Sequence, residues 1–143
     1  MESLFEILHV TTAIFLIGPM AVLPMAGLRA LRAGSASQVK TIATATALCG
    51  WLSLIVALLG FGLVSMADPK HDLSYTTPWL LASIVLYSIA VTITLSGVAP
   101  MMTRAADRLA DGTPATGVVP VAVLTVGSAL LLVAVTVLMV WRP

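Results

Sequence analysis

Four long runs of apolar residues, separated by short polar stretches, dominate this sequence. The runs cover about residues 4–31, 41–66, 78–102 and 117–141. Each exceeds the roughly 20 residues that an α-helix needs to cross a hydrocarbon layer about 30 Å thick. With the polar residues at their ends, the runs predict helices over about 4–33, 36–66, 78–110 and 117–141. We therefore expect an all-α fold, a bundle of four transmembrane helices forming one integral membrane domain over residues 1–143.

The composition agrees with a lipid environment. Of the 143 residues, 59% are hydrophobic and only 9% are charged, whereas soluble domains carry about 25% charged residues. The single cysteine, Cys49, lies inside an apolar run, so the chain cannot form an intramolecular disulfide. A net charge of +1 and the lack of a basic patch argue against a nucleic-acid partner. The expected partners are the lipid bilayer and either other membrane protein subunits or further copies of this chain.

Lysine and arginine are distributed unevenly between the two sides of the predicted bundle. The first and third connections, with the adjacent helix ends, carry Arg29, Arg32, Lys40, Arg104 and Arg108, and the opposite side carries Lys70 and Arg142. Basic residues of short loops are retained in the cytoplasm. This bias predicts a multi-pass protein of the bacterial plasma (inner) membrane, with the N-terminus and the C-terminus outside.

The third helix is expected to extend beyond the membrane as a charged segment that ends near Gly112. Two arginine–aspartate pairs in it are three residues apart, Arg104 with Asp107 and Arg108 with Asp111. This spacing predicts that each pair interacts on the helix surface.

An internal repeat is a further hypothesis. A shift of the sequence by 76 residues places Pro24 on Pro100, Met25 on Met101 and Arg32 on Arg108. This shift aligns the first helix with the third and the second with the fourth, and the aligned helices cross the membrane in the same direction. The hypothesis is therefore a 2+2 parallel repeat about an axis along the membrane normal. The alternative is that helices ending at the same interface both collect arginines.

Glu6 and His9 are the one carboxylate and the one imidazole within the long apolar runs. They are three residues apart, so both project from one side of a helix. His71 of the second connection, with Asp68 or Asp72, is expected on the same outer side, and Glu6, His9 and His71 are therefore candidate metal ligands. The structural interpretation, which the sequence favours, is that Glu6 interacts with the helix dipole in the first turn and that His9 lies close to the wet interface, so that no cofactor is predicted and a metal ion is the alternative.

Haem is the second candidate cofactor, with His9 as axial ligand and Glu6 as its hydrogen-bond partner. A second axial imidazole would have to come from His71. Four methionines near the cytoplasmic end are candidate Cu(I) ligands or packing residues, namely Met20, Met25, Met101 and Met102. The chain contains no GxxxxGK, GxSxG or CxxC motif, and its second, third and fourth apolar runs contain no Asp, Glu, His, Lys or Arg. The sequence thus favours a protein without catalytic residues and without an ion-coupled midplane site.

Three stretches carry a resemblance to a known family. They are Leu8-His9-Val10 followed by an apolar run with Gly18, PWLLASIVLY at 78–87, and VAPMMTRAADRLA at 98–110. In these the chain resembles an uncharacterised bacterial family of small four-helix predicted integral membrane proteins, which implies the fold but no established activity. More distantly, His9 is similar to the early histidine of HemJ-type protoporphyrinogen oxidases. Those proteins have a His and a Lys soon after the start of the third helix, where this chain has Leu80 to Ser83.

Two hypotheses of function follow from these observations. The first is a small polytopic membrane protein without a catalytic site, serving as an accessory or assembly subunit of a bacterial membrane complex. The second is a redox membrane protein that binds haem or a metal ion through His9 on the outer side.

Overall fold

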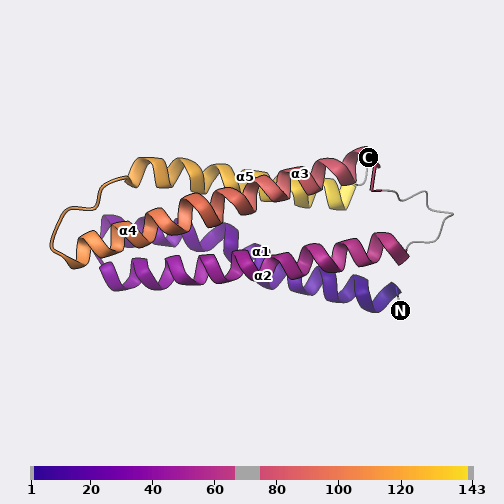
Figure 1. Cartoon of the computed structure of the whole chain (residues 1–143), viewed down its shortest axis with the longest axis horizontal. Coiled ribbons are helices and arrows are strands. Elements are labelled where there is room, and N and C mark those ends of the chain that lie inside the picture. Colours follow the sequence, from indigo (N-terminus) through magenta and orange to yellow (C-terminus); the bar gives the residue numbers. More distant parts are fainter. Residues whose placement is uncertain (1, 67–74, 142–143) are drawn as a thin grey trace.

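The computed structural model of this protein describes residues 2–66 and 75–141. It contains the helices α1 (Glu2–Arg32), α2 (Ala36–Met66), α3 (Pro78–Thr92), α4 (Ala99–Ala110) and α5 (Val118–Trp141), and a π-helix, η2 (Ile93–Val98). Because η2 joins α3 to α4 without a break, these three elements form one long span over Pro78–Ala110. The expected all-α bundle of four long apolar helices is confirmed, and Figure 1 shows the helices lying along one common axis.

All four spans have the length and the surface of membrane-crossing helices. The span windows are only 11–28% buried inside the protein. Large apolar side chains point outward on α1, α2, α3 and α5, as Phe15 does on α1 with 71% exposure and Val119 on α5 with 73%. Such a surface is stable in contact with lipid chains and not with water. The protein is therefore a multi-pass integral membrane protein with four spans.

The spans follow one another around the bundle. α1 packs against α2 and α5, and the third span packs against α2 and α5 as well. Two antiparallel hairpins result, α1–α2 and the third span with α5. We call the end at which α1 and α4 finish the turn end, and the end at which α1 begins and α5 finishes the terminal end (Figure 1).

Two glycines close the helices at the turn end in the same way. Gly34 and Gly112 have φ of 74° and 73°, a conformation that side chains with a Cβ rarely adopt. The amide of Gly34 donates to the Leu31 carbonyl and that of Ser35 to the Ala30 carbonyl, both at 3.1 Å. The corresponding bonds of Gly112 and the following residue go to carbonyls at positions 109 and 108. Both ends are Schellman motifs, which satisfy the last helical carbonyls.

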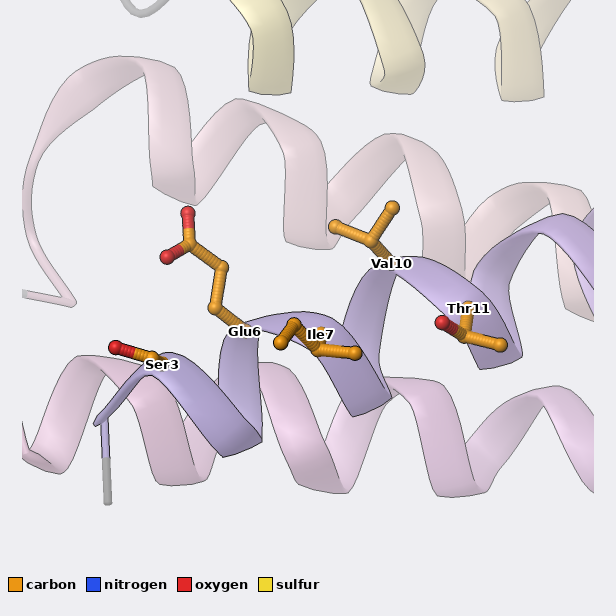
Figure 2. A pocket seen from close by; sticks show the side chains of 5 residues that line it. All are labelled: Ser3, Glu6, Ile7, Val10 and Thr11. Carbon is orange, nitrogen blue, oxygen red and sulfur yellow. The ribbon is translucent and has the colours of Figure 1, made fainter.

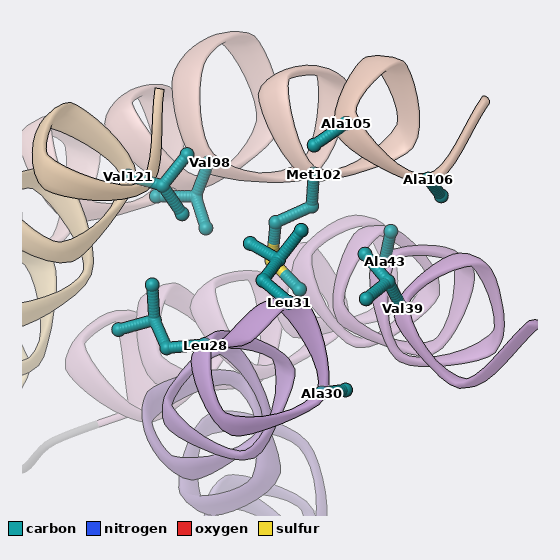
Figure 3. Packing of buried hydrophobic residues seen from close by; sticks show 10 residues of the cluster. All are labelled: Leu28, Ala30, Leu31, Val39, Ala43, Val98, Met102, Ala105, Ala106 and Val121. Carbon is teal, nitrogen blue, oxygen red and sulfur yellow. The ribbon is translucent and has the colours of Figure 1, made fainter. Parts of the chain in front are cut away.

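The core is concentrated at the turn end and in the middle of the bundle. The first cluster combines α1, α2, η2, α4 and α5, and Figure 3 shows Met102 reaching from α4 toward Leu31 of α1. The second cluster contains Met20, Ala90, Val91 and Leu132. Before Met20, by contrast, α1 has no buried residue from Ser3 onward. The two hairpins thus pack together mainly through the half of the bundle nearest the turn end.

The structure does not show the predicted internal repeat. Gly34 and Gly112, which end α1 and α4, are not related by the shift that superposes Pro24 on Pro100. The third span also contains the π-helix Ile93–Val98, whereas α1 is α-helical over its whole length.

The predicted pairing within the charged segment is wrong. Asp107 accepts a hydrogen bond from Lys40 of α2 at 2.9 Å, and Arg108 donates to the Thr116 hydroxyl at 2.7 Å. Tertiary packing brings the end of α4 beside α2, so a partner from another helix replaces the one on the same helix. Both members of the Lys40–Asp107 pair are more than half exposed, so the pair contributes at most about 1 kcal/mol.

Candidate functional site

His9 connects α1 to α2 at the terminal half of the bundle. Its Nδ1 lies 2.9 Å from the backbone carbonyl oxygen of Val56. A carbonyl oxygen only accepts, so Nδ1 carries the hydrogen and donates it. In the neutral imidazole, Nε2 then keeps its lone pair and is the nitrogen able to bind a metal ion or accept a hydrogen bond.

Gly60 provides the space that the His9 ring occupies. A Cβ at position 60 would lie 3.0 Å from Cε1 of His9 and 3.5 Å from Nδ1. A side chain there would therefore push the ring away from the Val56 carbonyl, which lies one helical turn before Gly60. The sequence did not predict that His9 packs against Gly60, because nothing in the sequence near either residue shows how α1 and α2 are aligned.

Glu6 faces a depression on the side of α1. The depression has a volume of about 450 Å³ and is lined by Ser3, Glu6, Ile7, Val10 and Thr11, all from one helix. Figure 2 shows the Glu6 carboxylate and Val10 projecting from the same side of α1. Glu6 is exposed, and the one salt bridge among residues 2–66 and 75–141 joins Lys40 to Asp107. Glu6 thus has no cationic partner in the part of the chain that the structure describes.

The structure separates the roles of the two predicted ligands on α1. His9 makes its hydrogen bond with α2, whereas Glu6 lines the open depression. His71, Asp68 and Asp72 lie outside the described residues. Within the described ranges, no three His, Cys, Asp or Glu residues are grouped closely enough to hold a metal ion.

The methionines lie in different surroundings. Met20 belongs to the second core cluster and Met102 to the first, and both are fully buried. Met25 is 43% exposed. This distribution favours the packing interpretation for the two buried side chains.

A set of buried hydroxyl groups lies inside the spans. The buried polar residues are Thr46, Ser53, Ser83, Thr94, Thr125 and Ser128. Ser53 is 2.8 Å from the Tyr87 hydroxyl, so this hydrogen bond joins α2 to α3. Thr46 and Ser53 recur at helical spacing with buried Gly50, and Thr125 recurs with Ser128, so each set lies on one face of its helix.

The π-helix η2 packs between α2 and α5. A Cβ at Gly50 of α2 would lie 2.8 Å from Cδ2 of Leu95, and one at Gly97 would lie 3.1 Å from Cδ1 of Leu124 on α5. π-helical turns are rare and frequently occur at functional sites. Here the π-helix lies where the two hairpins meet.

Comparison with known proteins identifies one family. The family model described as predicted integral membrane protein (DUF2269) matches residues 3–143. No curated protein and no solved structure matches the chain.

Proposed function

The chain belongs to the DUF2269 family of predicted integral membrane proteins, and from this premise we propose that it is an accessory or assembly subunit of a bacterial membrane complex. In this role the protein binds a transmembrane helix of another subunit instead of transforming a substrate. The terminal half of α1 is the proposed binding surface.

The observation that carries this proposal is the combination of a weakly packed helix segment and an ionisable group. Ser3 to Pro19 contain no buried residue, and Ile7 and Ile14 are 63% and 65% exposed. The exposed Glu6 lies on the same part of the helix. A carboxylate in a membrane span is costly unless a cation, a hydrogen-bond donor or water compensates it. A partner helix would cover the apolar surface and supply that donor.

The chemistry of the surface specifies the partner. Glu6 favours a lysine or arginine at the depth of the first helical turns, and the hydroxyls of Ser3 and Thr11 favour further hydrogen bonds. Ile7 and Val10 between them favour an apolar helix face. The proposed partner is therefore a transmembrane helix with one basic residue near its outer end.

Site-specific crosslinking in native membranes tests the proposal. A photoreactive amino acid at Ile7 should form an adduct with a second membrane protein whose crosslinked helix carries a Lys or Arg. Glu6→Lys should reduce that adduct at least tenfold, because like charges then face each other. Replacing the partner's basic residue by Glu should restore it.

Val123 on α5 provides the matched control, since it is 64% exposed, about the same as Ile7. A photoreactive residue there should not give the same adduct. Adducts from position 7 that contain only lipid would contradict the proposal. Adducts that contain only this chain would replace it with a homo-oligomer.

We also propose that the protein lies in the bacterial plasma membrane with both termini outside, on the basis of the five basic residues at the turn end. In a Cys49→Ala background, an impermeant thiol reagent applied to intact cells should label a cysteine at Ser74 and not one at Ser35. The opposite labelling pattern would invert the orientation.

A haem- or metal-binding redox protein is the second candidate function, and the hydrogen bond of His9 favours it. A histidine that binds a metal through one ring nitrogen commonly donates a hydrogen bond from the N–H of its other ring nitrogen to a carbonyl or carboxylate oxygen. This bond orients the ring and increases its basicity. The Nδ1 bond to Val56 would hold His9 in this way, with Nε2 as the ligand atom. Glu6 and His71 are the proposed further ligands for a metal ion.

The absorption spectrum and the metal content of the detergent-purified protein test this second candidate. It predicts a Soret band or a stoichiometric metal ion that is lost in His9→Ala. His9→Gln, which retains a hydrogen-bonding side chain, should lose it as well. A colourless, metal-free protein isolated from native membranes would exclude the candidate.

A further inference from the structure

Two threonine hydroxyls inside the bundle are fully buried without a hydrogen-bond partner. They are Thr46 of α2 and Thr125 of α5, both 0% exposed. Other threonines of the spans donate to the carbonyl four residues earlier, as Thr94 does to Ala90 at 2.8 Å. Thr46 and Thr125 do not make this bond, so their protons are free for another acceptor. Because an unsatisfied buried hydroxyl is destabilising, both need an explanation.

Contacts between α1 and α2 place Thr46 at the level of Pro24. A Cβ at Gly27 would lie 3.3 Å from Cγ2 of Ile42, and one at Gly50 would lie 3.6 Å from Sδ of Met20. Gly27 is thus level with Ile42, and Met20 with Gly50. Thr46 is midway between Ile42 and Gly50 on α2. Its counterpart on the antiparallel α1 is therefore Pro24, which is also fully buried.

Thr125 lies close to this level on α5. A Cβ at Gly50 would lie 2.8 Å from Cδ2 of Leu95, and one at Gly97 would lie 3.1 Å from Cδ1 of Leu124. Thr125 follows Leu124 directly, so it lies within about one helical turn of the level of Thr46.

The two threonines lie on diagonal helices. α2 and α5 each pack against α1 and against the third span. Both threonine side chains are fully buried inside the bundle and make no contact with lipid. Fully buried Val98 of η2 is next to Gly97, which contacts Leu124. We call Pro24, Thr46, Val98 and Thr125 the central layer.

Pro24 adds an acceptor to the central layer. Proline has no amide hydrogen, so the carbonyl of Met20, four residues earlier, lacks its usual helical donor. Two hydroxyl donors and one carbonyl acceptor thus occur within about one helical turn of each other along the bundle axis. The central layer contains no charged side chain that could balance an ion.

We propose that the central layer binds one water molecule. The water accepts hydrogen bonds from the hydroxyls of Thr46 and Thr125 and donates one to the Met20 carbonyl. Buried waters typically make about three hydrogen bonds to polar groups that are otherwise unsatisfied. Three oxygens are too few for the shell of a hard cation, which takes about six. The ligand class is therefore neutral and of the size of water.

A double-mutant cycle with Thr46→Val and Thr125→Val tests the site. Valine keeps the shape of threonine and removes the hydroxyl. Each single variant should shift the unfolding equilibrium roughly three- to tenfold toward the unfolded state, because the water is lost with the first hydroxyl and the remaining hydroxyl is left buried without a partner. The double variant should lose no more than one single variant, since the second change removes that unsatisfied hydroxyl.

Thr94→Val is the matched control, because Thr94 is equally buried but bonded within its own helix. Its effect should add to that of Thr46→Val without coupling. The proposal would be overturned if each single variant were neutral or stabilising and if the change in the unfolding equilibrium constant of the double variant equalled the product of the two single changes.

A measurement on the wild-type protein avoids variants that fail to fold. Solid-state NMR of the protein in lipid should detect magnetisation transfer from bound water to Thr46 and Thr125, and not to Thr94. Equal transfer to all three, or transfer to none, would rule out a localised water in the central layer.

Discussion

Gly27→Ala should lower the free energy of unfolding by roughly 1–3 kcal/mol, the range typical of overpacking in a well-packed core. A Cβ at this position would overlap the terminal methyl of Met102 and would lie 3.3 Å from its sulfur and from Cγ2 of Ile42. Met102 is fully buried in the first core cluster (Figure 3), so its flexible side chain has little space to move into. Reversible unfolding in detergent micelles, followed by circular dichroism, measures the effect.

Gly18→Ala is the matched control for this prediction. Gly18 lies on the same helix, and a Cβ there would have no atom within 4 Å. It should be neutral or slightly stabilising, because alanine favours a helix more than glycine. Combining Gly27→Ala with Met102→Ala should recover the part of the loss caused by the overlap. Equal effects at Gly18 and Gly27 would show that the contact between α1 and α4 does not govern stability.

Gly60→Val should detach His9 from α2 and loosen the terminal half of α1. The nearest atom to a new Cβ is Cε1 of the His9 ring, at 3.0 Å, and a branched side chain would displace the ring from the Val56 carbonyl. The expected loss is about 1–2 kcal/mol, from one hydrogen bond and the packing of the ring. Amide hydrogen exchange of residues 3–18 should increase, while exchange near the turn end should stay unchanged.

His9→Ala provides the cross-check, because it removes the same contact from the other side. Gly60→Val and His9→Ala should therefore be less than additive when combined. Gly127→Val serves as control, since a Cβ at Gly127 would meet nothing within 4 Å. Full additivity would mean that Gly60 and His9 stabilise the protein independently.

The family match establishes an integral membrane protein, and the proposed binding of a partner helix rests on the geometry of α1. The side chains that pattern reading selected, Glu6 and His9, lie on the least packed part of the bundle. That location suits the proposed binding of a partner helix, because the surface around Glu6 is open. The hydrogen bond of His9 with Val56 fixes this part of α1 to α2. The proposed water site lies elsewhere, in the packed middle of the bundle, and does not depend on the partner.

The sequence by itself determined the four helices and most of their ends. Continuous apolar runs leave no alternative to membrane-spanning helices, because every backbone polar group must be satisfied within lipid. The local signals also held, since Gly34 and Gly112 adopt the positive φ that ends a helix and Pro78 lies at a helix start. Each of these features depends on residues close together along the chain.

Only the tertiary structure decided which residues meet. The pairing of His9 with Val56 beside Gly60, and of Lys40 with Asp107, joins positions on different helices. The rotation of each helix about its own axis is decided by packing as well, because lipid makes all faces of these helices apolar and removes the polar stripe that marks the outside of a soluble helix. The burial of Thr46 and Thr125 is therefore a finding of the tertiary structure.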